Sequence, residues 1–175
     1  FNKGPVTPDH VIRIKSEPLI IPNKHLSSSK MIYNHINAYI KKYKNYFKKY
    51  KKNITNSKIA DPLPRIIILE GIGFLSIGLN KKEMQVSYDI FDAMKKVIIK
   101  ANLVSKFKSI NNTDIFKMEY WPLERAKLNN QNTKKFNGNV AVITGGAGKI
   151  GSAIANKFIN ENIEVILLDK NFKKL

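Results

Sequence analysis

The pattern of hydrophobic and polar positions predicts a long amphipathic helix over residues 27–52. Three serines at its start offer N-caps, and hydrophobic side chains then recur at the spacing that places them on one helical face. These positions are Ile32, Ile36, Tyr39, Ile40, Tyr43, Phe47 and Tyr50. The opposite face carries Lys41, Lys42, Lys44, Lys48, Lys49, Lys51 and Lys52.

The aromatic residues of this helix allow two interpretations. Exposed tyrosines beside lysines are typical of surfaces where bases stack on rings and phosphates pair with ammonium groups. Alternatively, the aromatic residues form the buried stripe and the lysines are only the solvated face. The regular spacing favours the buried stripe.

The segments on either side of this helix differ in pattern. Residues 1–25 contain four prolines, so we expect an irregular, partly extended stretch without a helix. The short apolar run at 65–69 predicts a strand buried on both faces. A glycine-bearing loop follows it, and Asn80 with Glu83 resembles a capping box at the start of a helix over 81–101.

The glycine-bearing loop is a weak ligand candidate. A loop of this kind can hold a phosphate at a helix N-terminus. However, its sequence GIGFLSIG matches neither the P-loop nor the dinucleotide-binding fingerprint. Its role therefore stays open.

Further along, Tyr120 and Trp121 precede Pro122, and we expect both aromatic residues to be packing anchors. The Asn- and Lys-rich run at 129–135 has no apolar periodicity and is interpreted as a linker. The expected division is therefore a region over 1–128, the linker, and a second region over 136–175.

The second region has the pattern of a βαβ unit. A buried strand of the parallel type is expected at 140–143, and a second strand at 163–168. Between them the sequence predicts a glycine-rich turn and a helix. The residues expected on the packing face of this helix are Ile150, Ala153, Ile154 and Phe158.

The turn carries the candidate chemistry, because glycines at its three key positions suit a bound pyrophosphate. The first glycine permits the tight turn, the second lets the pyrophosphate approach the backbone, and the third lets the helix pack closely on the sheet. The helix N-terminus then faces the phosphates with free N–H groups. The candidate cofactor-binding residues are Thr144, Gly145, Gly148, Lys149, Ile150, Gly151 and Asp169.

Asp169 decides the expected cofactor. It ends the second strand, where a carboxylate accepts hydrogen bonds from the adenine-ribose hydroxyls and repels a 2′-phosphate. NAD is therefore expected rather than NADP. Lys149 adds a positive charge near the phosphates and slightly weakens this preference.

Composition adds little to the case for a nucleic-acid partner. The formal net charge is +18, from 31 basic and 13 acidic residues, but 28 of the basic residues are lysine. Lys, Ile and Asn are encoded by A/T-rich codons, so we interpret the charge mainly as coding bias. Base recognition also favours arginine, so the charge is weak support for nucleic-acid binding.

Other function classes are excluded by what the sequence lacks. There is no cysteine, which rules out disulfides, Cys-ligated metals and a Cys nucleophile. The three histidines, His10, His25 and His35, have no metal-ligand spacing, so a His-built zinc site cannot come from this chain alone. No apolar run is long enough to span a membrane, and no signal peptide is recognisable.

The second region resembles the opening of a short-chain dehydrogenase/reductase. The stretch VAVITGGAGKIGSAIANKFINENIEVILLDKN carries the TGxxGxxG form of that family's glycine motif at Gly145, Gly148 and Gly151. The commonest form of the motif has glycine where this chain has Lys149. The resemblance implies an NAD(P)-dependent oxidoreductase in which a tyrosine is the general acid/base and a neighbouring lysine lowers its pKa.

The upstream region narrows the resemblance. The stretches TPDHVIRIK at 7–15, PRIIILEGIGFLSIG at 64–78 and MEYWPLERAKL at 118–128 are similar to the bifunctional rhamnulose-1-phosphate aldolase/alcohol dehydrogenase family. That family joins a class II aldolase-type region, through a middle region, to a short-chain dehydrogenase. It implies aldol cleavage of a phosphorylated deoxysugar and nicotinamide-dependent oxidation of the resulting lactaldehyde, in cytoplasmic carbohydrate metabolism.

The resemblance also implies that this chain is an internal fragment. The zinc histidines of the aldolase would lie before Phe1, and the catalytic Ser and Tyr-x-x-x-Lys of the dehydrogenase after Leu175. We therefore assign no catalytic or metal-binding residue here, give His10 a structural role, and expect the fragment alone to be inactive. The full-length protein is expected to form a homo-oligomer, with a small hydroxy, aldehyde or sugar-phosphate substrate and no membrane partner.

The expected fold is α/β: a middle α/β region followed by the first βαβ unit of a Rossmann-type doubly wound parallel sheet. Because two strands and one helix bury little surface, residues 136–175 should be loosely held unless they dock on the preceding region. Two alternatives stay open. One is a basic module that binds nucleic acid or an anionic surface, and the other is a purely structural connector.

Overall fold

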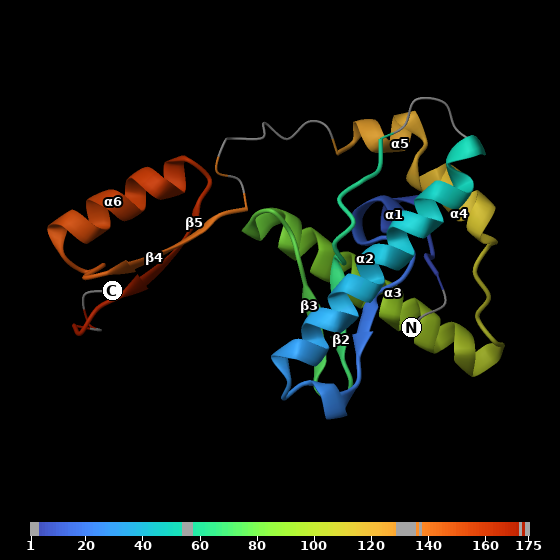
Figure 1. Cartoon of the computed structure of the whole chain (residues 1–175), viewed down its shortest axis with the longest axis horizontal. Helices are drawn as coiled ribbons and strands as arrows, with labels where there is room; N and C mark the ends of the chain where they lie inside the picture. Colours follow the sequence, from blue (N-terminus) through green and yellow to red (C-terminus); the bar gives the residue numbers. More distant parts are fainter. Residues whose placement is uncertain (1–3, 54–57, 129–135, 137, 172, 174–175) are drawn as a thin grey trace. The chain divides into compact units, whose positions relative to one another are not determined.

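The computed structural model describes residues 4–53, 58–128, 136, 138–171 and 173 (Figure 1). These form two compact units, which are treated separately: residues 1–77 with 85–130, and residues 78–84 with 131–175. The expected linker at 129–135 lies outside the described residues. Helices and small sheets alternate in both units, so the expected mixed α/β class is confirmed.

The first unit is built on a three-stranded sheet with strand order β1-β2-β3. Its strands are β1 (Leu19–Ile21), β2 (Ile66–Leu69) and β3 (Gly73–Ser76). Strands β1 and β2 are parallel, with Leu19 opposite Ile67, and β3 runs antiparallel to β2. Strand β2 confirms the strand expected at 65–69.

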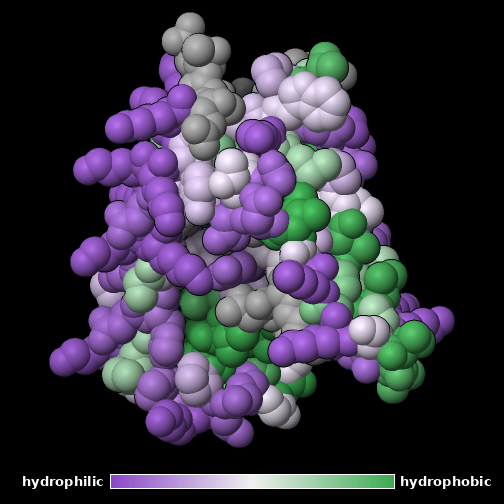
Figure 2. Space-filling model, turned by 90° about the vertical axis from the view of Figure 1, so that its right-hand side faces the viewer, coloured by the Kyte–Doolittle hydropathy of each residue, from purple (hydrophilic) through white to green (hydrophobic). Residues whose placement is uncertain are grey.

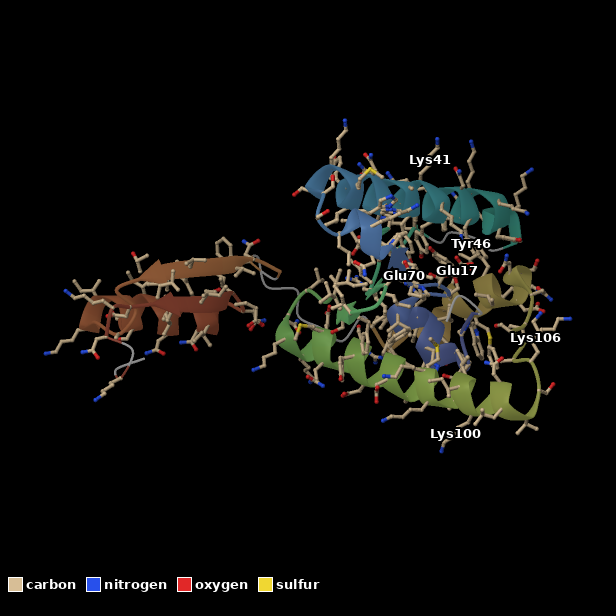
Figure 3. The ribbon with its side chains drawn as sticks, turned by 90° about the horizontal axis from the view of Figure 1, so that it is seen from below. Glu17, Lys41, Tyr46, Glu70, Lys100 and Lys106 are labelled. Carbon is tan, nitrogen blue, oxygen red and sulfur yellow. The ribbon has the colours of Figure 1, made fainter. Side chains whose placement is uncertain are left out.

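Two long helices cover the two faces of this sheet (Figures 1 and 3). On one face, Leu19, Ile21 and Ile67 pack against α2 (Ser29–Tyr50). On the other face, Ile66 packs with buried residues of α3 (Lys81–Val104), among them Phe91. Strand β2 is thus covered from both sides, which explains its continuous run of apolar residues.

Helix α2 confirms the expected amphipathic helix. Ser28 is the N-cap, and its hydroxyl accepts a hydrogen bond from the Met31 amide at 3.4 Å. Tyr43 and Phe47 are buried, whereas Lys41 points away from the body of the unit (Figure 3). Hydrophilic side chains also predominate on the face of the molecule shown in Figure 2. The buried-stripe interpretation is therefore correct for Tyr43 and Phe47.

The expectation that prolines exclude a helix from residues 1–25 is wrong. Helix α1 spans Pro8–Ile14, with Thr7 as its N-cap. Proline is tolerated at the first helical position because the N–H it lacks has no partner within the helix there. Val11 and Ile14 are buried, so α1 is part of the core, and a short 3-10 helix follows at Asn23–His25.

The glycine-bearing loop is in fact largely a β-hairpin. The tight turn between β2 and β3 contains Gly71 at φ +78°, and the Ile72 amide donates to the Leu69 carbonyl at 3.0 Å. The loop residues 73–76 form strand β3. The expected capping of the next helix is confirmed, since the Glu83 amide donates to the Asn80 side chain at 2.9 Å.

Two short helices complete the first unit: α4 (Asn112–Glu119) and α5 (Pro122–Ala126). Tyr120, between them, is only 2% exposed and is a packing anchor as expected. Trp121 is 47% exposed, so the same expectation is wrong for Trp121. The two neighbours differ because Trp121 is the N-cap of α5 and starts a new helix at Pro122. A 3-10 turn at Lys51–Asn53 follows α2.

The second unit contains the expected strand–helix–strand order: β4 (Val140–Thr144), α6 (Lys149–Asn160) and β5 (Glu164–Leu168). The two strands are parallel, with Val142 opposite Ile166. Both of these side chains are at least half exposed, so the expectation of a fully buried β4 is wrong. Helix α6 covers one face of the two strands. Ile143 is the only residue of β4 that is buried among the described residues.

The packing face of α6 also differs from the one expected. Gly151 and Ala155 are its buried residues. Ile150 is 79% exposed, Ala153 is exposed and Ile154 is 42% exposed, whereas Phe158, the fourth residue expected on this face, is half-buried. The small residues face the sheet because the helix lies very close to the preceding turn. None of the described helices has both the length and the apolar character needed to cross a bilayer.

Candidate functional site

The turn between β4 and α6 is held by its glycines. Gly145 follows β4 at φ +71°, a left-handed conformation that favours glycine. Its carbonyl accepts a 3.0 Å hydrogen bond from the Gly148 amide, which closes the turn. The Gly146 amide donates to the Leu168 carbonyl at 3.2 Å and ties the turn to the end of β5.

Close packing requires glycine at two further positions. A Cβ atom on Gly151 would lie 2.3 Å from the Gly145 carbonyl oxygen, so no side chain fits there. A Cβ atom on Gly146 would lie 2.8 Å from the Cβ of Leu167. Gly146 was not among the expected site residues. Its adjacency to Gly145 was the available signal, but its contact is with β5 and only the fold reveals it.

The N-terminus of α6 is open to a ligand. Gly148 is the N-cap, and no side chain caps the first turn. The amides of Lys149 and Ile150 have no intrahelical partner at this position, and Gly148 offers them no capping side chain. These amides carry the positive end of the helix dipole. The expected residues Gly148, Lys149 and Ile150 thus lie together at this helix end.

Asp169 lies at the same end of the sheet. Thr144 is opposite Leu168 in the parallel register, so β4 and β5 end side by side. The Asp169 carboxylate accepts hydrogen bonds from the Ala147 amide at 3.1 Å and the Asn171 amide at 2.8 Å. The side chain therefore also stabilises the turn. Each carboxylate oxygen keeps a further lone pair that could accept a hydrogen bond from a ribose hydroxyl. The expected contact with the ribose stays a prediction.

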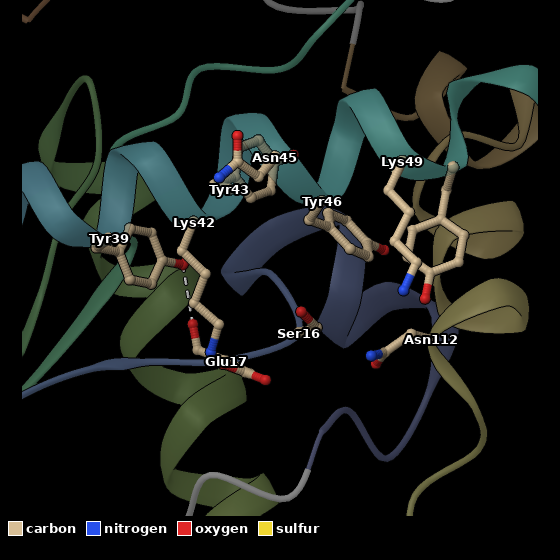
Figure 4. Close-up of a pocket in the computed structure, with 10 residues that line it drawn as sticks. Ser16, Glu17, Tyr39, Lys42, Tyr43, Asn45, Tyr46, Lys49 and Asn112 are labelled. Atoms are coloured by element: carbon tan, nitrogen blue, oxygen red, sulfur yellow. Dashed lines mark hydrogen bonds and ion pairs between the residues drawn. The ribbon is translucent and has the colours of Figure 1, made fainter.

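The first unit contains a separate pocket of about 260 Å³ beneath α2. Figure 4 shows Tyr39, Lys42, Tyr46 and Lys49 projecting from α2 toward Ser16, Glu17 and Asn112. Tyr43, Asn45 and Tyr50 also line this pocket. Sequence reasoning missed this pocket, because its far side comes from residues distant from α2 along the chain.

A buried polar cluster lies behind the pocket wall. The Tyr43 hydroxyl donates to Glu119 at 2.6 Å and lies 2.8 Å from the Tyr120 hydroxyl. Burial raises the pKa of the Glu119 carboxyl, and burial beside Glu119 raises the pKa of Tyr43. The hydroxyl of Tyr46 and the second oxygen of Glu119 are also buried and make no hydrogen bond of normal geometry among the described residues, but Tyr46 and Glu119 interact, and this interaction helps to raise the pKa of Tyr46.

Lys15 brings a positive charge into this cluster. Its side chain is only 6% exposed, and its ammonium lies 3.5 Å from the centre of the Tyr43 ring and donates to the Asp61 carbonyl. Burial lowers the pKa of Lys15 to about 8, although the charge of Glu119 opposes this shift. Burial thus disfavours the charged forms of both Lys15 and Glu119, and the attraction between the two groups partly offsets this effect.

The histidines form no metal centre in the described part of the chain, where no cluster of three or more His, Cys, Asp or Glu side chains could hold an ion. His25 Nδ1 and His35 Nε2 are 2.8 Å apart and join the 3-10 turn to α2. His10 lies in α1, where burial lowers its pKa. The structural role expected for His10 fits this position.

Among known proteins, residues 1–128 match the model of a family described as "Aldolase class II, second domain". A relative from Bacillus subtilis (strain 168), named "Uncharacterized oxidoreductase YuxG", is 31% identical over 176 residues. That alignment covers 97% of this chain but 25% of the relative, so the chain spans about a quarter of the relative's length. No solved structure shows significant similarity to the chain.

Proposed function

Because this chain belongs to the family of class II aldolase second domains, and its relative bears an oxidoreductase name, we propose that it is part of a longer bifunctional enzyme. In this proposal residues 1–128 are the middle region between an aldolase-type domain and a dehydrogenase. Residues 136–175 open a short-chain dehydrogenase domain of Rossmann type that binds NAD. The reaction oxidises a small hydroxy or hydroxy-aldehyde substrate, of the lactaldehyde type, released from a sugar phosphate such as rhamnulose 1-phosphate.

The observation that carries the proposal is the turn from Gly145 to Gly151 at the uncapped start of α6. A Cβ atom on Gly148 would meet the Gly145 carbonyl oxygen at 3.2 Å, so a side chain there would crowd the turn. Free amides and the helix dipole favour a pyrophosphate at such a helix end. The residues present therefore fit a dinucleotide, which would supply the hydride acceptor.

The chain's own residues would bind and orient this cofactor. Amides at Lys149 and Ile150 would donate to the pyrophosphate, and Thr144, Gly145 and Gly151 would shape the turn beneath it. Asp169 would accept hydrogen bonds from the ribose hydroxyls and repel a 2′-phosphate, so we propose NAD rather than NADP. Proton transfer and substrate binding would depend on residues outside this sequence.

The experiment that tests this proposal is a titration of the longer protein that contains this chain with NADH and NADPH, followed by the change in nicotinamide fluorescence. We expect NADH to bind more tightly. Asp169→Asn removes the charge but keeps an oxygen that can accept from the Ala147 amide. This variant should bind NADH about tenfold more weakly, because one charge-assisted hydrogen bond is lost. It should also discriminate less against NADPH.

The matched control is Asp114→Asn, a change of an exposed carboxylate in the first unit. It should leave the affinities for both cofactors unchanged. If that longer protein binds neither cofactor, or if Asp169→Asn leaves the ratio of its affinities for NADH and NADPH as it was, the dehydrogenase assignment of this turn is wrong. A structural connector would then be the better description of the chain.

A further inference from the structure

We propose that the pocket beneath α2 binds a small organic anion with a flat ring. This site lies in the first unit, is independent of the proposed dinucleotide site, and is described here as the tyrosine pocket. It is formed by one face of α2, the segment that follows α1, and the start of α4 (Figure 4). Its charge favours an anion, and its aromatic walls favour a ring.

The charge of the tyrosine pocket is positive. Its acidic side chain, Glu17, already pairs with the Lys42 ammonium. Lys49 also lines the pocket, and no acidic side chain of the described residues pairs with its ammonium. One cation is therefore available for a ligand. A carboxylate or phosphate on the ligand would make a charge-assisted hydrogen bond with Lys49.

The walls of the tyrosine pocket are aromatic. The Tyr39 hydroxyl donates to the Glu17 carbonyl at 2.9 Å, and the Tyr43 hydroxyl donates to Glu119. With its hydroxyl engaged, Tyr39 presents its ring to a ligand, whereas Tyr43 is buried with the Lys15 ammonium over its ring. The Lys49 ammonium lies 5.3 Å from the centre of the Tyr50 ring. A ligand ring packed against Tyr50 would thus bring an attached acid group close to Lys49.

The far side of the pocket supplies neutral polar groups, the Ser16 hydroxyl and the Asn112 amide. Both can donate hydrogen bonds to ligand oxygens. A volume of about 260 Å³ is just below the usual range of ligand pockets, which begins at about 300 Å³. It suits a single ring with one acid group and is too small for a whole dinucleotide. The ligand class is therefore distinct from the cofactor proposed for the other unit.

The test uses phenyl phosphate as the probe, titrated into the isotopically labelled chain and followed by amide chemical shifts in NMR spectra. A ligand of this size should bind with a Kd of about 1 mM. The shifts should centre on residues 16–17, 42–50 and 112. Inorganic phosphate has the acid group without the ring, and benzyl alcohol has the ring without the acid group. Each should bind at least tenfold more weakly than phenyl phosphate.

Matched variants on α2 separate the pocket from the general charge of the helix. Lys49→Met should weaken phenyl phosphate binding about tenfold, whereas Lys48→Met, an exposed neighbour outside the pocket, should not. Tyr50→Leu should weaken binding severalfold. The control for that change is Tyr33→Leu, because Tyr33 is 65% exposed and also outside the pocket.

Four outcomes would overturn the proposal. These are an absence of binding, an equal loss in Lys48→Met and Lys49→Met, equal affinity for inorganic phosphate, or tighter binding of a glutamate-rich peptide than of phenyl phosphate. The last result would assign the surface to a protein partner. Lys49 is exposed and makes no ion pair among the described residues, so Lys49→Met tests the charge without disturbing the fold.

Discussion

Tyr43 of α2 and Glu119 of α4 are joined by a 2.6 Å hydrogen bond in the interior of the first unit. Glu119 is 2% exposed, and its second oxygen makes no hydrogen bond of normal geometry among the described residues, although Tyr46 interacts with this carboxyl group. The Tyr43 hydroxyl is therefore the donor that compensates the burial of this carboxyl group. Most buried polar groups in proteins are compensated in this way, and losing the partner is costly.

Tyr43→Phe should lower the free energy of unfolding by about 2 kcal/mol, because it leaves a buried carboxyl oxygen unsatisfied. Urea denaturation followed by the fluorescence of Trp121, the chain's single tryptophan, reports on this unit. Tyr33→Phe is the control, since Tyr33 is 65% exposed and its hydroxyl is open to water. Equal stability of the two variants would show that the bond to Glu119 contributes nothing.

The free energy of unfolding should depend on pH through the titration of the buried Lys15. Its folded pKa of about 8 lies below the unfolded value of 10.5, so the unfolded chain binds more protons between these values. Lys15 alone should therefore raise the free energy of unfolding by about 2 kcal/mol between pH 8 and pH 10, with most of the net rise below about pH 9.5, where the tyrosines of the unfolded chain still hold their protons. Denaturation at each pH unit would measure the rise.

Above pH 10 the tyrosines reverse this trend. Burial raises the pKa of Tyr39, Tyr43, Tyr46 and Tyr120, so the folded state holds protons that the unfolded chain loses. Stability should fall there. Lys15→Met should abolish the rise between pH 8 and pH 10 and keep the fall above it, and a variant that retained the rise would assign it to another group.

Gly151→Ala should disrupt the turn before α6, because the added Cβ atom would lie 2.3 Å from the Gly145 carbonyl oxygen. Overpacking of this kind typically costs 1–3 kcal/mol. We expect faster amide hydrogen exchange in α6 and a loss of NADH binding. Asn156→Ala changes an exposed residue of the same helix and should alter neither. Unchanged exchange in Gly151→Ala would contradict the close packing described here.

Gly71 tests backbone conformation without a steric clash. It has φ +78°, and an added Cβ atom would meet only the Asn23 side chain, at an ordinary contact distance of 3.5 Å. Gly71→Val should lower stability by about 1–3 kcal/mol through backbone strain alone. Gly71→Asn should lower it less, because asparagine tolerates the left-handed region. Denaturation curves of the two variants, compared with the unmodified chain, would measure the difference.

The sequence predicted the elements whose pattern is local. The 3.6-residue repeat from Ile32 to Tyr50 was enough to predict α2, and Asn80 with Glu83 was enough to predict the start of α3. The parallel strands β4 and β5 also follow from short apolar runs around a glycine-rich turn. In each case the signal lies within the element itself or directly beside it.

The misjudged features depend on packing between elements, which the pattern within one element does not contain. Pro8 appeared to exclude a helix, but burial of Val11 and Ile14 stabilises α1, and proline suits its first position. The apolar pattern of α6 suggested that Ile150 packs inward, whereas Gly151 and Ala155 allow the closer approach. The tyrosine pocket also escaped prediction, because Ser16 and Asn112 reach α2 only through the packing of α1 and α4.

The parallel pairing of β1 with β2 has a consequence for the order of folding. Leu19 and Ile67 are separated by twice as many residues as Val140 and Glu164, which begin the other parallel pair. Closing the longer loop costs more chain entropy, and contacts distant in sequence form slowly. The β2–β3 hairpin and the β4–α6–β5 segment should therefore become structured first. Strand β1 should pair with β2 late. Ser16 and Glu17, which form part of the far wall of the tyrosine pocket, lie just before β1. The pocket should therefore be among the last features of the first unit to form.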